Sequence, residues 1–329
     1  MPGGRRPITR RDFLSISAGL SGGAMLSGCL RRSASRPRVA VVKVPRYFPG
    51  IRDLLLPHFR RFELQLKGKR VLIKPNLVDA HGPDETVFTH PAVLAAAIEL
   101  FGGLGANVVI AEGSGLRRDL NTLLHHSGYA DILAKYSVPF IDLNLDSVEK
   151  VRIPSDHTGL GYLFVPKTVL GADFIVSLPK LKTHHWVGVT LSLKNMLGIM
   201  PGTSYGWPKN KFHVMGLEES ILDVNQAVRA HFAIVDGVVG VEGNGPLFGE
   251  PRQAGVVIMS SDPLAADFVA ARVMGIDPDK VGYLRSAWRE AGRQVSGRGS
   301  WRNIEIIGSS INSVKQKFRL VEKFGYLRS

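Results

Sequence analysis

The chain has 329 residues, of which 44% are hydrophobic, and carries 42 Lys and Arg against 28 Asp and Glu, a formal net charge of +14. The apolar fraction excludes a disordered chain, and the length is sufficient to bury one large core or two small ones. A single cysteine excludes an intramolecular disulfide framework, a four-cysteine iron–sulfur site and a Cys-rich zinc site. The charge favours anionic partners but does not determine a fold.

The first thirty residues have the pattern of a bacterial export signal. Residues 9–14 read TRRDFL, and the apolar stretch 13–26 that follows the arginine pair is too short to be a permanent membrane helix. The stretch ends in Leu26-Ser-Gly-Cys29, which resembles a lipobox, the motif whose cysteine is lipidated and becomes the new N-terminus. Gly19, Gly22, Gly23 and Gly28 count against the alternative of a structural helix.

This signal predicts the organisation and location of the chain. We expect a twin-arginine lipoprotein signal over 1–28, a tether over 29–37, an α/β domain over 38–311 and a basic amphipathic tail over 312–329 that packs against the domain. The predicted location is the periplasm or another extracytoplasmic membrane face, at the inner or the outer membrane. The predicted partners are the twin-arginine translocation machinery, a membrane reached through lipidated Cys29 and a small anionic ligand. Nucleic acid is not expected as a partner of an exported protein.

Short β-branched runs alternate with helical patterns along the mature chain. The predicted strands are Val39–Val44, Arg70–Ile73, Asn107–Ala111, Val138–Leu143, Phe174–Leu178, Ala233–Val235, Gly255–Met259 and Asn303–Ile307. The predicted helices are Pro91–Phe101, Leu217–Val228, Pro263–Met274 and Pro278–Ala291. This alternation predicts an α/β fold with an open, largely parallel, Rossmann-like sheet and helices on both faces. Residues 198–212, rich in Gly and Pro, are interpreted as a long mobile loop over a site.

Polar side chains follow most of the predicted strands. In order along the chain they are Lys74, Asn76, Glu112, Asp142, Asn144, Lys180, Lys182, His184, Asp236 and Asp262. The carboxyl ends of parallel strands meet at one edge of the sheet, where ligands of open α/β folds bind. The sequence therefore predicts one crevice that mixes cations, carboxylates and amides.

Residues 177–184, SLPKLKTH, are the densest of these segments. If they stay extended, the two-residue period places Lys180, Lys182 and His184 on one face. Three cationic groups side by side repel one another unless an anion lies between them. We expect a carboxylate or phosphate there, from a ligand or from Glu112 or Asp236. A solvated basic loop is the alternative.

Two further segments complete the predicted site. Helical spacing in 190–198, TLSLKNMLG, places Lys194 and Asn195 away from the core side, where burial would lower the lysine pKa; a lysine that extends to solvent is the alternative. Residues 236–246, DGVVGVEGNGP, are interpreted as a glycine-dense loop that bears Glu242 and Asn244 and can approach an anion closely. Because this segment lacks the lysine and serine of a P-loop, it is a weak nucleotide signal. Tight turns would explain it equally.

Metal binding has little support in the sequence. No HExxH motif occurs, so a divalent metal site would have to be assembled from the scattered His81, His90, His184 and His213. No iron–sulfur cluster is expected. Asp262 precedes a proline at a predicted helix start and is interpreted as a helix cap.

Several of these motifs, in this order, resemble one family. They are Val71-Leu-Ile-Lys-Pro-Asn76, Leu178-Pro-Lys-Leu-Lys-Thr-His184, the segments 190–198 and 236–246, Ser261-Asp-Pro263 and Ala266-Asp267. The set resembles the bacterial and archaeal domain-of-unknown-function family numbered 362, over about 39–275. This family has no settled activity, and the ferredoxin-type cysteines of some members are absent after position 29 here. It is distantly similar to the lactate racemases, which implies proton-transfer chemistry by analogy only.

Two classes of function remain open. The first is an exported, lipid-anchored enzyme that performs racemase-like or epimerase-like proton transfer, or metal-assisted chemistry, on a small anion. Its predicted catalytic residues are His184, Lys194, Glu112 and Glu242. Its predicted ligand-binding residues are Lys74, Asn76, Lys180, Lys182, Asn195, Asp236 and Asn244. The second class is non-catalytic: a lipoprotein that binds an anionic ligand or cofactor, or a structural partner of a membrane complex.

Overall fold

Valine- and isoleucine-rich runs form strands at each of the predicted places. The computed structural model describes residues 36–78, 86–115, 119–292 and 303–328. Within them, ten strands form one sheet and two form a separate antiparallel pair. The strands are β1 (Arg38–Lys43), β2 (Arg70–Pro75), β3 (Asn107–Glu112), β4 (Phe140–Asp142), β5 (Val148–Arg152), β6 (Tyr162–Pro166), β7 (Phe174–Leu178), β8 (Lys180–His184), β9 (Gly188–Thr190), β10 (Phe232–Asn244), β11 (Phe248–Ser260) and β12 (Glu305–Gly308).

The main sheet is largely parallel, as predicted. Its order is β12-β1-β11-β10-β7-β2-β3-β4, with β8 beside β10 and β9 beside β8. Only β11 and β9 run against their neighbours among these strands. Because β11 is antiparallel, its last residue Ser260 pairs with Val39 and Ala233, near the amino ends of β1 and β10. Asp262 therefore lies at the edge opposite the predicted crevice, which corrects its place in the predicted site; it caps α10 instead.

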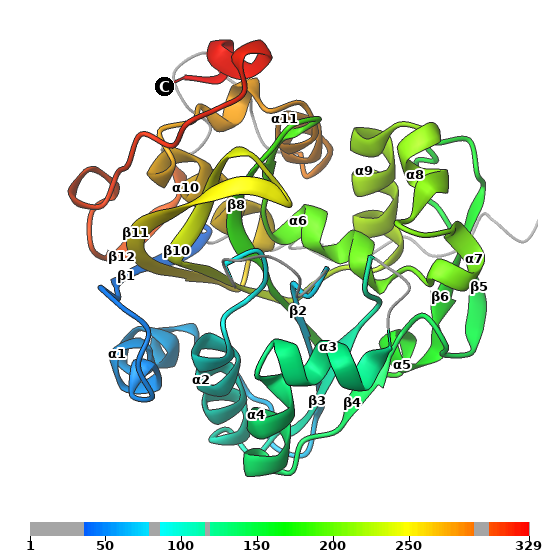
Figure 1. The fold of residues 1–329 in the computed structure, drawn as a ribbon, viewed down its shortest axis with the longest axis horizontal. Helices are drawn as coiled ribbons and strands as arrows, with labels where there is room; N and C mark the ends of the chain where they lie inside the picture. The colour runs from blue at the N-terminus through cyan, green and yellow to red at the C-terminus, as the bar shows by residue number, and fades with distance from the viewer. Residues whose placement is uncertain (1–35, 79–85, 116–118, 293–302, 329) are drawn as a thin grey trace, which may run out of the picture. The chain divides into compact units, whose positions relative to one another are not determined.

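Helices cover both faces of the sheet (Figure 1). They are α1 (Ile51–Phe59), α2 (Pro91–Gly102), α3 (Leu120–His126), α4 (Tyr129–Tyr136), α5 (Lys167–Leu170), α6 (Ser192–Asn195), α7 (Gly202–Tyr205), α8 (Asn210–Val214), α9 (Leu217–Ala227), α10 (Pro263–Val273) and α11 (Gly282–Glu290). Val39 and Val41 of β1 face one core cluster, with α6, α9, α10 and α11. Ala40 and Val42 face the other, with α1, α2 and α4. The two-residue period of a strand thus supplies both cores.

The glycine-dense segment 236–246 was predicted to be a loop, and this prediction is wrong: most of the segment is strand. β10 continues to Asn244 and pairs with β11 in a long hairpin. Its glycines serve the packing of two strands: a Cβ on Gly240 would lie 2.7 Å from the carbonyl oxygen of Leu181 in β8. The small residues therefore let β8 and β10 lie closer together than side chains would allow.

The segment 198–212, predicted to be a long loop, also contains more helix than predicted. It contains the end of a 3-10 helix (Met196–Ile199), all of α7 and the start of α8. Tyr205 and Phe212 are buried and stack with ring centroids 4.5 Å apart. Both residues also belong to the first core cluster, and the Phe164 backbone N–H donates to the Tyr205 hydroxyl at 2.7 Å. These contacts fix the segment against the body, which the Gly and Pro content did not indicate.

The C-terminal segment packs on the first core cluster. Phe318, Phe324 and Leu327 are buried members of that cluster. The predicted helix 278–291 is divided into a 3-10 turn (Pro278–Lys280) and α11, because Val281 between them has an extended backbone. Within the described residues, no helix is both long enough and apolar enough to cross a membrane. The predicted signal, Cys29, the tether up to residue 35 and His81 lie outside those residues.

Candidate functional site

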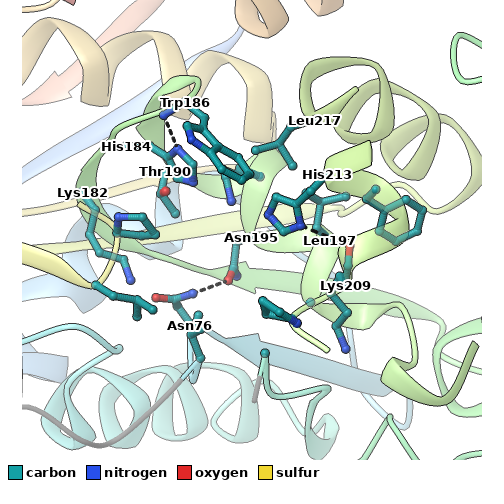
Figure 2. Close-up of a pocket in the computed structure, with 18 of the residues that line it drawn as sticks. Asn76, Lys182, His184, Trp186, Thr190, Asn195, Leu197, Lys209, His213 and Leu217 are labelled. Atoms are coloured by element: carbon teal, nitrogen blue, oxygen red, sulfur yellow. Dashed lines mark hydrogen bonds between the residues drawn. The ribbon is translucent and has the colours of Figure 1, made fainter. Parts of the chain in front are cut away.

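A cavity of about 260 Å³ lies at the carboxyl ends of β2 and β3 and beside β8. Figure 2 shows polar side chains around this space, among them Asn76, Lys182, His184, Asn195 and Lys209. The predicted residues that line it are Lys74, Asn76, Glu112, Lys182, His184, Lys194 and Asn195. Segments from widely separated parts of the chain meet here because parallel strands bring their carboxyl ends to one edge.

A buried ion pair forms the floor of the cavity. The Lys74 ammonium lies 2.7 Å from Glu112 Oε2 and also donates to Asn195 Oδ1 at 3.0 Å. The Asn195 amide donates back to the Lys74 carbonyl at 3.1 Å and to Ser177 Oγ at 3.1 Å. These bonds hold β2, β3, β7 and α6 together at the site, so the pair has a structural as well as an electrostatic role.

Gly198 allows the helical segment 192–199 to approach this pair. A Cβ at this position would lie 2.5 Å from Glu112 Oε1 and 2.7 Å from the Lys74 ammonium. No larger residue fits without displacing the pair. The glycine that ends the TLSLKNMLG motif is therefore a requirement of the site itself.

A second buried carboxylate, Asp267 of α10, positions α6. Its two oxygens accept from the backbone N–H groups of Ser192 at 2.7 Å and Leu193 at 2.9 Å. These are first-turn donors that the helix itself leaves unpaired. Burial raises the Asp267 pKa to about 8. Asp267 thus fixes the direction in which α6 presents Lys194 and Asn195 to the cavity.

Three more lysines line the same cavity: Lys182, Lys194 and Lys209. Among the described residues, none of the three forms an ion pair with a carboxylate. Burial lowers the pKa of Lys194 to about 8, with the Lys74 charge adding to the effect, and burial lowers that of Lys209 to about 8. Burial and then the neighbouring lysines hold the pKa of Lys182 well below its usual range. The cavity is short of negative charge.

His184 lies among these lysines as a neutral ring. Its Nδ1 accepts from the backbone N–H of Trp186 at 3.0 Å. Burial, then the Lys194 charge, lowers its pKa. A neutral ring that accepts at Nδ1 carries its proton on Nε2, so His184 is a hydrogen-bond donor through that atom.

Several buried oxygen atoms at the cavity have no hydrogen-bond partner among the described residues. They are Asn76 Oδ1, Glu112 Oε1 and Thr190 Oγ1. Buried polar atoms are normally paired, and an unpaired one costs about 1–3 kcal/mol. The cavity thus combines three lysines without a carboxylate partner and three oxygen atoms without a hydrogen-bond partner among the described residues, which is the pattern of a site that is completed by a ligand.

The structure places four predicted site residues outside the cavity lining. Lys180 pairs with Asp236 at 3.0 Å, and Tyr47 bridges the two. Glu242 pairs with Arg319 at 2.9 Å, and Asn244 is exposed near the end of β10. Lys180 and Lys182 share a strand face by period, but the pairing of β8 with β10 shifts register between them. They consequently meet different partners.

Sequence reasoning missed Lys209 as a site residue. It lies at the start of α8 with a left-handed backbone, φ 69°, and its ammonium donates to Asn144 Oδ1 at 2.8 Å. Asn144 follows β4, so that predicted residue positions a lysine of the cavity. No local pattern indicates Lys209 as a site residue, because its position depends on α7 and on Asn144, which lies 65 residues earlier in the chain.

Two of the four histidines from which a metal site would have to be assembled, His184 and His213, line the cavity. Across the residues that the structure describes, no group of three or more His, Cys, Asp and Glu is placed to hold a metal ion. His184 lies on β8 and His213 on α8, whereas His90 does not line the cavity and stacks on Tyr47 with ring centroids 3.6 Å apart.

Fold and cavity together define an α/β protein with a cationic ligand crevice at the carboxyl edge of a mostly parallel sheet. The family model described as domain of unknown function (DUF362) matches residues 71–272, more than half of the chain, and the chain belongs to this family. The resemblance identified from the motifs is thereby confirmed.

Two known proteins illustrate what the chain is similar to. A thylakoid-associated protein of Synechocystis sp. is 28% identical over 236 residues, which cover 70% of each chain. The lactate racemase apoprotein of Thermoanaerobacterium thermosaccharolyticum aligns in structure with a TM-score of 0.42 and 14% identity. That alignment covers 71% of this chain and 57% of the racemase.

Proposed function

We propose that the cavity binds a small organic anion and transfers a proton at the carbon next to its charged group. The observation that carries this proposal is the set Lys182, Lys194 and Lys209, three lysines that line one cavity without a carboxylate partner among the described residues. Like charges repel strongly where water is scarce. An anion in the middle would offset this repulsion and favour the charged forms of the lysines, whose pKa values are lowered in the free protein by burial and by neighbouring lysines.

The chemistry follows from the protonation of these groups. A lysine with a pKa of about 8, such as Lys194, is unprotonated in a useful fraction of molecules near neutral pH and serves as the general base. His184 donates through Nε2 and stabilises negative charge that develops on the ligand. Lys182 and Lys209 hold the charged group, and Asn76 and Thr190 accept from ligand donors.

The test is exchange of a ligand proton with solvent. Small carboxylates incubated with the protein in D2O are expected to gain deuterium at the carbon next to the carboxylate, measured by NMR. Lys194→Met should abolish this wash-in, and Lys182→Met should weaken binding by tenfold or more, as measured by calorimetry. Lys150→Met, an exposed lysine of β5, is the matched control and should change neither.

Each part of the proposal fails separately. No binding of any carboxylate or phosphate would overturn the anion site. Binding without wash-in would overturn the proton transfer and leave a non-catalytic anion-binding protein. If deuterium wash-in persists in Lys194→Met, Lys194 is not the general base and another residue removes the proton.

We also propose that the protein is exported by the twin-arginine machinery and anchored through lipidated Cys29. The TRRDFL and Leu26-Ser-Gly-Cys29 motifs support this proposal. The Synechocystis relative is named as thylakoid-associated. In the native host, Cys29→Ala should release the protein from the membrane fraction. Lysines in place of Arg10 and Arg11 should stop export; unchanged fractionation of both variants would overturn the proposal.

A further inference from the structure

The cavity changes character between its floor and its mouth. Its inner wall carries the buried lysines, whereas its lining also includes two aromatic side chains that are strongly exposed. Trp186, in the turn between β8 and β9, is 51% exposed, and Phe248, at the start of β11, is 77% exposed. Leu247 and Leu217 line the space with them. We call Trp186, Leu217, Leu247 and Phe248 the apolar rim.

The apolar rim is held in place by other contacts. The Trp186 ring packs edge-on against His185 and His213, with centroids 5.2 and 5.0 Å apart, and its backbone N–H donates to His184. The backbone of Phe248 is fixed by its pairing with Asn244 across the hairpin, while the side chain extends to solvent. A preformed surface loses little conformational freedom when a ligand binds to it. Figure 2 shows Trp186 and Leu217 at one end of the space, with Asn76 and Lys209 at the other.

Size limits what the charged part of the cavity can hold. The volume of about 260 Å³ is below the range of about 300–1,000 Å³ that is typical of pockets for drug-sized ligands. A compact head group fits among the lysines, but a larger ligand must extend past the rim. Exposed aromatic residues that continue a cavity offer apolar surface for such an extension.

We propose that the ligand is a single-chain amphiphilic anion, with its charged head among Lys182, Lys194 and Lys209 and its apolar chain along Trp186 and Phe248. This inference rests on the proposed anion site and names its substrate class. The charge of the lysines selects the head, and the rim selects the chain. Exposed apolar residues elsewhere, such as Leu145 and Tyr326, do not line the cavity and need no such explanation.

The experiment measures affinity along two homologous series, from butanoate to decanoate and from butyl to decyl phosphate, below their micelle concentrations. Burying one methylene on the rim should raise affinity by up to about fourfold. The double variant Trp186→Ala/Phe248→Ala should lose most of this gain while its affinity for butanoate or butyl phosphate stays the same. Tyr326→Ala, another exposed aromatic residue, is the control and should retain the full chain-length dependence.

The outcomes separate this inference from the anion site on which it rests. If the four-carbon anions bind and longer chains bind no better, the inference of an amphiphilic ligand is wrong, whereas the proposed anion site stands. A chain-length gain that survives in the double variant would also overturn it, because the chain would then lie elsewhere. If no member of either series binds, both proposals fall. Thermal unfolding of each variant confirms that it is folded, which is expected because both side chains are exposed.

Discussion

Two buried lysine–carboxylate pairs lie at neighbouring strand ends, and they differ in what remains unsatisfied. In the cavity, Lys74 pairs with Glu112 at 2.7 Å, but Glu112 Oε1 has no partner among the described residues. Beside β10, Lys180 pairs with Asp236 at 3.0 Å, and both Asp236 oxygens are occupied. Their further donors are the Tyr47 hydroxyl and the backbone N–H groups of His90 and Val238.

This difference separates a structural pair from one that belongs to a site. A saturated pair has no capacity left for a ligand, and its removal leaves an uncompensated buried charge. An unsaturated pair next to unpaired lysines can still gain bonds. The sequence presents both as a lysine near a carboxylate at a strand end, so residue type alone does not distinguish them.

Removing one partner from each pair should have the largest effect. Lys180→Met and Lys74→Met should each destabilise the protein by about 3–5 kcal/mol, because Asp236 or Glu112 is left as an unpaired buried charge. Urea unfolding measures this loss. Only Lys74→Met should also weaken binding of a small carboxylate, because the stranded Glu112 charge faces the cavity.

A second substitution checks the cause of that instability. Lys180→Met/Asp236→Leu removes both charges and should recover much of the lost stability. Equal loss of carboxylate affinity in Lys180→Met and Lys74→Met would show that Lys180–Asp236 is not a purely structural pair and that the distinction between the two pairs is wrong.

Asp267, a buried carboxylate held by backbone N–H groups, should have a smaller effect. In Asp267→Asn, one acceptor becomes a donor that faces the N–H of Ser192 or Leu193, at a cost of about 1–3 kcal/mol. Because α6 carries Lys194 and Asn195, anion affinity should fall as well. Calorimetry and urea unfolding measure the two effects on the same samples.

Asp223 of α9 is the matched control for Asp267. It is equally buried and also accepts from two backbone N–H groups, those of His157 and Thr158, at 2.9 Å each. It does not line the cavity. Asp223→Asn should therefore lose stability without losing anion affinity; a matching loss of affinity would mean that Asp267 acts only through global stability.

The pH dependence of anion binding tests the cavity lysines. Lys194 and Lys209 have pKa values of about 8 in the free protein, and a bound anion favours their charged forms. Below about pH 7 both lysines are already charged, so neither adds to the pH dependence there, and any further rise in affinity comes from Lys182, whose pKa burial holds well below its usual range. Above pH 8, binding must take up protons, and affinity should fall by up to about tenfold per pH unit for each lysine.

An arginine at position 194 sharpens this measurement. Arginine stays charged throughout the range, so Lys194→Arg should remove one of the two contributions to the slope. A slope that is the same in both proteins would exclude Lys194 as a titrating group of the site.

The fold could be predicted from the sequence because its strands are local patterns. Runs such as Val71–Ile73 and Val109–Ala111 are apolar and buried on both faces, which is typical of parallel strands. The convergence of Lys74, Glu112 and Lys182 followed from that one topological rule. The direction of β11 did not follow, because an antiparallel strand has the same composition, and Asp262 was misplaced for that reason.

The details of the site depend on contacts that no local pattern contains. The register shift between β8 and β10 separates Lys180 from Lys182, and the contact of Asn144 with Lys209 depends on how α7 and α8 fold back. Glu242 was expected near the crevice because its segment was interpreted as a loop. Glu242 instead belongs to β10, which continues past the cavity, and its side chain pairs with Arg319.

The Glu242–Arg319 pair should have the smallest effect of the three ion pairs. Its atoms lie 2.9 Å apart, but the Arg319 side chain is 55% exposed, so solvent screens the interaction. Glu242→Gln keeps an acceptor for the Arg319 backbone N–H and should change the free energy of unfolding by less than about 1 kcal/mol. Wash-in and anion affinity should be unchanged. A loss of wash-in in Glu242→Gln would restore the acid–base role expected of this residue from sequence, and would require the hairpin to close over the cavity during the reaction.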